Sequence, residues 1–325
     1  MLEIVIASGK GGVGKSTLSS TLALILGKNG EKVVAVDADA EAPNLHLIFG
    51  VKEWEIVKDY REGWIAKIRY EKCDNCGICE KECPFKAIKL VDDKYVINEM
   101  ICEGCLTCSI ACPQRAIYRV RTSSGLLRAG KTPYGFPIVG AKLAVGRPNS
   151  GKLVTEVKNL AKEIGGNDSY YIVDAAAGIG CQVVSSLAGA NGVILVVEPT
   201  PASLNDVARL HKLVKHFMLP SAIVINKADI NPDFIPEILR FAERENIQYL
   251  GKIPYDDKVP ESLILMKPLI QVFPESPASK ALIDISNRIY QEIILNWREW
   301  FRRYKPAKPE PYKPLIIRPD NIPGG

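Results

Sequence analysis

Short apolar runs alternate with segments of helical periodicity along most of the chain. Residues 2–7 (LEIVIA) and 32–36 (KVVAV) read as buried strands, and similar runs lie at 170–173, 193–197, 222–225 and 249–253. Strands that are buried on both faces of a parallel sheet have this pattern. Residues 16–26 place leucine at positions 18, 22 and 26, which predicts a helix. The pattern predicts an α/β fold with a mostly parallel, doubly wound sheet.

Three segments depart from this pattern. Residues 67–119 break the alternation of strands and helices, and residues 125–150 are rich in glycine and proline, as in strands and turns. Residues 151–164 then predict a helix, and residues 279–304 predict one long helix with a single buried face. The proline-rich residues 305–325 predict an extended tail. We therefore expect a main domain at 1–66 and 120–304, with a second domain inserted at 67–119.

Composition and charge narrow the class of protein. The chain has 325 residues with 42 basic and 37 acidic side chains, and its net charge of +5 gives no reason to expect a nucleic-acid partner. The N-terminus has no signal pattern and no apolar run reaches membrane-spanning length, so we expect a cytoplasmic protein. Nine cysteines in such a protein favour metal or redox chemistry over disulfides.

The segment GKGGVGKST at residues 9–17 follows the first predicted strand and opens the first predicted helix. Gly9, Gly14, Lys15 and Ser16 fit the phosphate-loop pattern GxxxxGK[ST]. In such a loop, backbone N–H groups hold phosphates, the lysine neutralises them and the hydroxyl binds Mg²⁺. A second lysine, Lys10, is not required by this pattern and needs a purpose of its own.

Acidic residues follow two of the predicted strands. Asp37 and Asp39 follow the second strand, and Asp174 to Gly178 (DAAAG) follow the strand at 170–173. Ligands of open α/β sheets bind at the carboxyl ends of the strands. Carboxylates at this position can bind Mg²⁺ or orient a water molecule that attacks a phosphate. A solvated acidic turn is the alternative for Asp37 and Asp39.

The combination of KGGVGKST with DxD resembles the MinD/ParA family of P-loop ATPases, which also includes the nitrogenase iron protein and the Mrp-type iron–sulfur carriers. The resemblance implies that Lys10 reaches across a homodimer interface to the phosphates of the other subunit. It also implies that Asp39 positions the attacking water, while Asp37 and Asp174 lie near Mg²⁺ with Ser16. The residues expected to hold the phosphates are Gly9, Gly11, Gly12, Val13, Gly14, Lys15, Ser16 and Thr17.

Two further segments resemble the base-binding parts of the same family. Asn226, Lys227 and Asp229 form an NKxD pattern, which selects guanine in GTPases, whereas the matching asparagine of the MinD/ParA family contacts adenine. Pro254 and Tyr255 resemble the loop that covers the base. We expect ATP because Lys10 and the DxD pattern belong to the ATPases, with Mg²⁺ as the metal.

Eight of the nine cysteines lie in the inserted segment as two runs of C-x2-C-x2-C-x3-C-P. This spacing is the signature of two-cluster bacterial ferredoxins, in which the fourth cysteine of each run ligates the other cluster. It predicts one [4Fe–4S] cluster on Cys73, Cys76, Cys79 and Cys112, and a second on Cys102, Cys105, Cys108 and Cys83. Zinc sites usually have two C-x2-C pairs with a longer spacer, and a reducing compartment argues against disulfides. We expect an α+β fold similar to that of bacterial ferredoxins.

Two motifs have weaker interpretations. Cys181 lies where the nitrogenase iron protein has a cluster-binding cysteine, but that protein supplies two cysteines per subunit, so we expect Cys181 to be a small buried residue. Residues 146–152 repeat the GxxxxGK pattern, but Leu153 stands where a hydroxyl is needed. We expect no phosphate site there.

These observations predict an ATP-hydrolysing homodimer whose nucleotide state gates electron transfer through two clusters to a redox partner protein. An iron–sulfur carrier of Mrp type, which passes a cluster to an acceptor protein, is the first alternative. A positioning switch is the second, because residues 296–305 (NWREWFRRYK) are aromatic and basic and could lie on a membrane. We favour a packed last helix over membrane binding.

Overall fold

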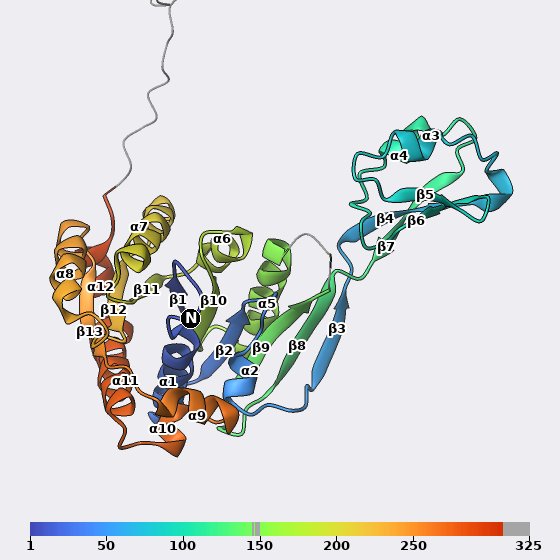
Figure 1. Cartoon of the computed structure of the whole chain (residues 1–325). Coiled ribbons are helices and arrows are strands. Elements are labelled where there is room, and N and C mark those ends of the chain that lie inside the picture. Colours follow the sequence, from blue (N-terminus) through green and yellow to red (C-terminus); the bar gives the residue numbers. More distant parts are fainter. Residues whose placement is uncertain (145, 147–149, 308–325) are drawn as a thin grey trace, which may run out of the picture.

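The centre of the computed structural model, which describes residues 1–144, 146 and 150–307, is a nine-stranded sheet of order β13-β12-β11-β1-β10-β2-β9-β8-β3 (Figure 1). In this order the strands are Gln248–Ile253, Ser221–Asn226, Gly192–Val197, Leu2–Ser8, Tyr170–Ala177, Val33–Ala38, Pro137–Leu143, Gly125–Lys131 and Ile56–Tyr60. The pairings from β13 to β9 are parallel, and β8 and β3 add an antiparallel edge. The prediction of a mostly parallel sheet is confirmed.

Helices cover both faces of the sheet. The helices on one face are α5 (Ser150–Gly165), α6 (Cys181–Leu187), α7 (Pro201–His216) and α8 (Ile235–Arg244), the last preceded by the turn η2 (Pro232–Phe234). On the other face lie α1 (Lys15–Lys28), α2 (Leu45–Ile48), α9 (Lys258–Ile264), α10 (Leu269–Val272), α11 (Pro277–Arg288) and α12 (Trp297–Tyr304). The doubly wound arrangement is therefore confirmed.

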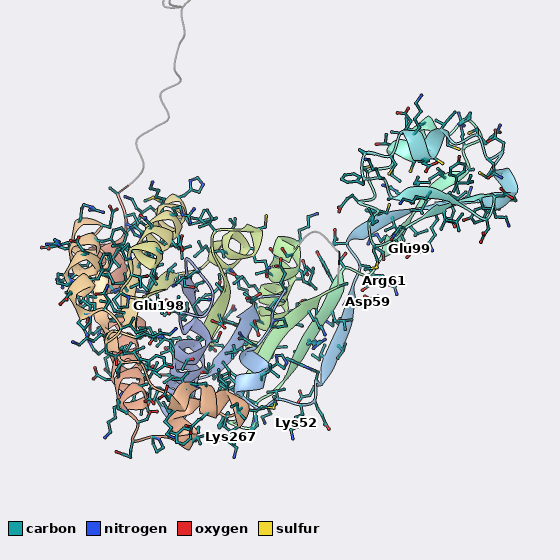
Figure 2. The ribbon with its side chains drawn as sticks, viewed as in Figure 1. Lys52, Asp59, Arg61, Glu99, Glu198 and Lys267 are labelled. Carbon is teal, nitrogen blue, oxygen red and sulfur yellow. The ribbon has the colours of Figure 1, made fainter. Side chains whose placement is uncertain are left out.

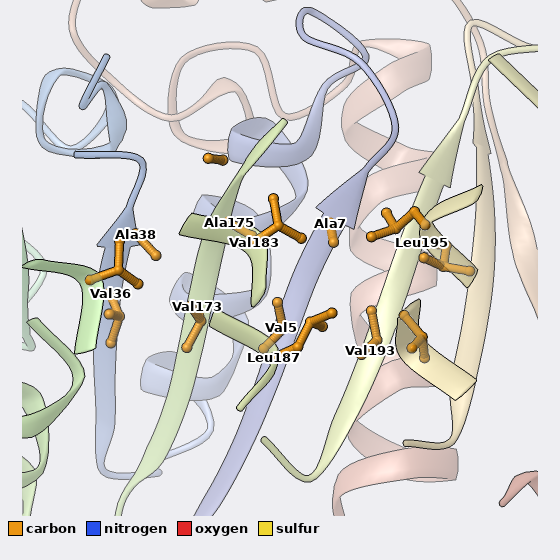
Figure 3. Packing of buried hydrophobic residues seen from close by; sticks show 14 of the residues in the cluster. Val5, Ala7, Val36, Ala38, Val173, Ala175, Val183, Leu187, Val193 and Leu195 are labelled. Atoms are coloured by element: carbon orange, nitrogen blue, oxygen red, sulfur yellow. The ribbon is translucent and has the colours of Figure 1, made fainter. Parts of the chain in front are cut away.

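The apolar runs fold as strands because each strand buries both of its faces. In β1, Val5 and Ala7 pack into the core on the side of α5 to α8, while Ile4 and Ile6 pack on the side of α1. Figure 3 shows the first of these cores, where Val5 lies with Val183 and Leu187 of α6. A continuous apolar run is therefore needed in the central strands, rather than the alternation of a half-exposed sheet.

Residues between β3 and β8 form a separate structure at the end of a two-stranded stalk (Figure 1). The stalk pairs β4 (Gly63–Ile68) with β7 (Ile117–Thr122) in antiparallel fashion. Beyond it lie η1 (Tyr70–Lys72), α3 (Ile78–Lys81), β5 (Ile88–Val91), β6 (Lys94–Ile97) and α4 (Thr107–Ala111). This part has its own small core, which includes Ala66, Ile88 and Ile117.

The prediction of one long helix at 279–304 was wrong. A π-helical segment, η3 (Ile289–Ile294), follows α11, and α12 starts again at Trp297. The wider turn rotates the residues that follow it, and Trp300 of α12 is buried against Gly192 of β11. Among the described helices, none combines the length and the apolar character needed to cross a bilayer. Most of the tail, and residues 147–149 of the second GxxxxGK segment, lie outside the described residues.

Candidate functional site

The loop between β1 and α1 contains two glycines at positions where neighbouring atoms leave no room for a Cβ. Gly14 has a φ of +93°, and a Cβ there would lie 2.2 Å from the side-chain nitrogen of Asn226. A Cβ on Gly9 would lie 2.3 Å from the Cβ of Asp206 on α7. These close approaches hold the loop at the N-terminus of α1, where no described side chain caps the helix. The free N–H groups of this first turn form an anion-binding site.

A cavity of about 640 Å³ lies over this loop, which is a volume typical of ligand pockets. The predicted site residues that line it are Gly11, Gly12, Gly14, Lys15, Ser16, Thr17, Asp39, Asp174, Asn226, Lys227, Pro254 and Tyr255. Apolar side chains from α2, α9 and α11 line the rest of the cavity, among them Leu47, Val259 and Leu282. The cavity thus has a polar, phosphate-binding part and an apolar part suited to a base.

Asp174 and Ser16, two of the residues predicted to lie near Mg²⁺, are in direct contact. Asp174 is buried, and it accepts hydrogen bonds from the Ser16 hydroxyl at 2.5 Å and the Ser19 hydroxyl at 3.0 Å. Burial raises the pKa of Asp174 to about 6, although these hydroxyls and Lys15 favour the charged form. A divalent cation beside this carboxylate would offset the cost of its charge. Sequence reasoning missed Ser19, which lies one helical turn after Lys15.

Asp37 is placed behind the cavity rather than in its lining. Its carboxylate accepts backbone N–H groups of Leu45 at 2.9 Å and Asp39 at 3.2 Å. Burial, and then the charge of Asp174, raise its pKa well above the usual value. The side chain therefore shapes the turn that carries Asp39 toward the cavity and leads into α2, while its Mg²⁺ role stays a prediction.

A glutamine links the loop after β2 to the segment that follows β10. Asp39 accepts the backbone N–H of Ala42, and the N–H of the intervening Ala40 donates to Gln182 Oε1 at 2.8 Å. Gln182 is buried in the first turn of α6, just beyond the DxxxG motif. The loop after β2, which carries Asp39, is therefore hydrogen-bonded to the segment that follows Asp174. No motif marked Gln182, and only its place after Gly180 could have suggested it.

The NKxD segment supports the phosphate loop directly. The Asn226 amide donates to the carbonyl of Val13 at 2.8 Å, and Lys227 Nζ donates to the carbonyl of Gly12 at 3.1 Å. Asp229 accepts the N–H of Tyr255 at 2.7 Å, which joins this segment to the loop after β13. These bonds place the NKxD segment beside the part of the cavity that is suited to a base.

Lys10 lies in an ion pair outside the cavity lining. Its Nζ lies 2.6 Å from Glu198 Oε2, while Lys227 Nζ lies 2.6 Å from Glu198 Oε1. Glu198, which is labelled in Figure 2, lies on the central sheet side of the molecule and not in the cysteine-containing insertion. Burial alone would raise the pKa of Glu198, but the two lysines hold it below its usual value. Sequence reasoning named Glu198 only as the end of a strand and gave it no role.

The structure beyond the stalk gathers the cysteines around two small cavities. Cys73, Cys76, Cys79 and Cys112 line the first cavity, and Cys83, Cys102, Cys105 and Cys108 line the second. These are the two predicted sets, in which the fourth cysteine of each run crosses to the other set. Three backbone N–H groups point at these sulfurs: Ala66 to Cys102, Ala87 to Cys83 and Ala116 to Cys112. Such bonds stabilise thiolates.

Comparison with known proteins identifies the family. The sequence profile of the CobQ/CobB/MinD/ParA nucleotide binding domain matches residues 4–269, which include the phosphate loop, Asp174 and Asn226. The chain belongs to this family. It is a P-loop ATPase of MinD/ParA type, as the loop and the acidic motifs predicted. The matched span also contains the cysteine-rich insertion.

Relatives of this MinD/ParA-type chain cover most of its length. Two uncharacterized proteins of Methanocaldococcus jannaschii are 36% and 31% identical to it, over 90% and 92% of this chain and 98% of each relative. An iron–sulfur cluster carrier protein of Pyrococcus furiosus is 25% identical over 90% of this chain and 86% of its own length. The septum site-determining protein MinD of Pyrococcus horikoshii, complexed with Mg-ADP, aligns over 90% of this chain and 96% of its own, with a TM-score of 0.55 and 21% identity. At this identity, the likeness to MinD concerns the fold.

The interpretation of Cys181 as a buried residue was wrong. The residue is exposed, because it begins α6 immediately after the DxxxG loop of the ATPase domain. Its backbone packs tightly against α5, where a Cβ on Gly151 would lie 3.0 Å from the Cys181 carbonyl oxygen. The thiol itself therefore lies at the surface, close in sequence to Asp174 and Gly178.

Proposed function

We propose that this ATPase is a homodimeric iron–sulfur protein in which the nucleotide state gates electron transfer through two [4Fe–4S] clusters to a protein partner. The observation that carries the proposal is the sorting of eight cysteines into two cavities with four thiols each. This arrangement stands on a stalk that leaves the edge of a nucleotide-binding sheet. A cytoplasmic location fits thiols that are free rather than bridged.

The donor sets fit four-iron clusters better than single ions. In the described residues, no three His, Cys, Asp or Glu side chains converge on one metal-ion position. A single zinc ion would need its sulfurs at about 2.3 Å from one centre. A cubane cluster instead binds each thiolate on a different iron, so its ligands surround a cavity, as these cysteines do. When bound, such clusters accept and release one electron at a time.

The two cavities lie at different distances from the ATPase domain. Ala66 of β4 lines the second cavity, and Ile68, which is farther along the outgoing strand, lines the first. The set containing Cys102 therefore lies nearer the sheet, and the set containing Cys73 lies at the distal end. This order supports an electron path along the insertion, which we propose is a ferredoxin-like domain at residues 67–119 within an ATPase domain at 1–66 and 120–304.

At the nucleotide, the residues of this chain perform binding and positioning. Lys15 and the N–H groups at the start of α1 neutralise the phosphates, and Asp174 and Ser16 hold Mg²⁺. Asp39 orients the attacking water from the loop that Asp37 shapes. Lys10 of the opposite subunit adds positive charge where the transferring phosphoryl group gains negative charge, so hydrolysis requires the dimer.

Packed elements connect the nucleotide site to the stalk. Asp174 leads into the DxxxG loop and α6, whose first residue, Cys181, packs against Gly151 of α5. The next residue of α5 is Lys152, and its Nζ lies 3.7 Å from Oε2 of Glu62. Glu62 lies between β3 and β4, where the stalk begins. A shift of α6 on nucleotide exchange therefore has a continuous path to the cluster-binding part. Contiguity supports the proposed coupling, and the coupling itself needs a direct measurement.

Anaerobic purification tests the assignment of the clusters. We expect about eight irons per chain and a [4Fe–4S] signal in EPR spectra of the reduced protein. Cys76→Ser, at the distal set, and Cys105→Ser, at the set near the sheet, should each alter one cluster and leave the other intact. One iron site per chain, or zinc in place of iron, would contradict the proposal.

A second candidate is an iron–sulfur carrier, which is the printed name of relatives from Pyrococcus furiosus, Pyrococcus abyssi and Pyrococcus horikoshii that are 25% to 26% identical to this chain. The exposed thiol of Cys181 would suit a transfer site. A carrier must lose cluster iron to an acceptor, whereas an electron-transfer protein keeps it. Incubation of the ⁵⁵Fe-labelled protein with an apo-ferredoxin and Mg-ATP distinguishes the two: retained label supports electron transfer, and transferred label supports the carrier.

A further inference from the structure

The proposed mechanism needs Lys10 at the other subunit's nucleotide, but the structure holds this lysine within its own subunit. Glu198 lies between two lysines, at 2.6 Å from Lys10 Nζ and 2.6 Å from Lys227 Nζ. The Glu198 side chain is 11% exposed and that of Lys10 is 38% exposed. A carboxylate that is shielded from water in this way attracts a nearby lysine more strongly than a surface carboxylate does.

The backbone around Glu198 is fixed by the start of α7. The Glu198 N–H donates to the Ser203 hydroxyl at 3.0 Å, and the Ser203 N–H donates to the Thr200 hydroxyl at 3.2 Å. Thr200 is the N-cap of α7, and Pro201 begins the helix. The carboxylate is thus held in place at the carboxyl end of β11 before any ligand arrives.

The same carboxylate restrains the phosphate loop at a second point. Lys227, the other partner of Glu198, donates to the Gly12 carbonyl at 3.1 Å. The Cα of Gly9 packs against Asp206 on α7, the helix that follows Glu198. The segment from Gly9 to Gly12, which carries Lys10, is therefore held against β11 and α7 on both sides of the lysine.

We propose that Glu198 is a positioning residue that retains Lys10 in its own subunit until a second subunit presents bound ATP. This inference rests on the trans role of Lys10 in the proposed function. Dimer formation would exchange one carboxylate partner of Lys10 for the more highly charged triphosphate of the other subunit. The free energy of the Lys10–Glu198 pair then opposes assembly, so Glu198 sets the protein and ATP concentrations at which the dimer forms.

Sedimentation velocity with Mg·AMPPNP, a nucleotide that is not hydrolysed, tests this role. Glu198→Gln keeps the shape of the side chain and removes its charge, and we expect the dimer dissociation constant to fall about tenfold. The matched control is Glu245→Gln, which removes the same charge from the C-cap of α8, where Glu245 pairs with Lys215. It should leave dimerisation unchanged. Equal or weaker dimerisation of Glu198→Gln would overturn the inference.

A double-mutant cycle separates retention of Lys10 from a general effect on the loop. In a Lys10→Ala background, Glu198→Gln should no longer change the dimer dissociation constant, because the retained group is gone. An effect of full size in this background would overturn the inference. Glu198→Asp keeps the charge but weakens the contact, because its side chain is shorter. Its dimer dissociation constant should lie between those of wild type and Glu198→Gln, and this variant replaces Glu198→Gln if the latter binds nucleotide poorly. If wild type stays monomeric with Mg·AMPPNP, both the proposed dimer and the inference are wrong. If wild type and Glu198→Gln dimerise equally, only the inference is contradicted.

Discussion

The site contains two buried carboxylates on neighbouring strands, and both carry a cost in the absence of metal. Asp37 of β2 and Asp174 of β10 are paired directly in the sheet register. Burial raises the pKa of each, and their mutual repulsion adds to the effect on Asp37. These two carboxylates therefore lower the stability of the metal-free fold, and a bound cation would offset this cost.

Asp174→Asn should separate stability from activity. The pKa of Asp174 is raised from 3.8 to about 6, so the folded state binds the proton more tightly than the unfolded state. This group therefore lowers stability as pH rises from about 4 to about 6, and the loss persists at pH 7. Without metal at pH 7, the variant should be about 2–3 kcal/mol more stable in urea unfolding, while Mg²⁺-dependent ATPase activity falls at least 100-fold. The exposed Asp284→Asn is the control, and a variant less stable than wild type would contradict the assignment.

His211 on α7 should make the fold sensitive to acid. The side chain is buried beside Phe241, and burial lowers its pKa from 6.5 to about 4. The unfolded state takes up this proton first, so the contribution is fully present above pH 6.5 and is lost as pH falls toward 4. Between pH 7 and pH 4, the free energy of unfolding of wild type should fall by about 3 kcal/mol more than that of His211→Leu, as measured by urea unfolding. Parallel stability curves for the two proteins would exclude His211 as a source of acid sensitivity.

At the scale of elements, continuous apolar runs predicted the parallel strands, and the motifs at their carboxyl ends predicted which loops meet. Two features could not be predicted in this way. The strands β8 and β9 lie in a segment rich in glycine and proline, and the strands they pair with depend on long-range contacts. The π-helical break at Ile289–Ile294 follows from how Trp300 packs on the sheet, which helical periodicity alone does not contain.

The last helix is part of the core rather than a free amphipathic segment. Trp300 packs against Gly192 and donates from Nε1 to Gln248 Oε1 at 2.5 Å. Trp300→Ala should therefore lower the free energy of unfolding by about 3–5 kcal/mol. The half-buried Trp297→Ala is the matched control and should cost clearly less. Equal, small losses in both variants, measured by urea unfolding, would indicate that α12 is only loosely attached.

At the scale of the whole molecule, spacing alone assigned the cysteines to two sets, because the two-cluster pattern relates each fourth cysteine to the other run. Two polar contacts could not be predicted from the sequence. Gln182 joins the loop after β2 to the start of α6, and Glu198 joins Lys10 to Lys227, between residues that are far apart in the sequence. The order of the two cysteine sets along the stalk likewise comes from the register of β4 with β7.

The dimer proposal predicts that ATPase activity depends on protein concentration. Specific activity of wild type should rise with concentration as subunits associate, because each site lacks a lysine supplied by the other subunit. Lys10→Ala should reduce this activity at least 100-fold and remove the dependence, while it still binds Mg·ATP through Lys15. Full activity of Lys10→Ala in a steady-state assay would rule out the role of this lysine in trans.

The central claim is that the nucleotide state controls the clusters. Its most direct test is an EPR-monitored redox titration of the protein with and without Mg·AMPPNP, in wild type and in Lys10→Ala. The account predicts that the nucleotide shifts the reduction potential of at least one cluster in wild type and has no such effect in Lys10→Ala. Identical potentials with and without nucleotide, in wild-type protein that has dimerised, would contradict it.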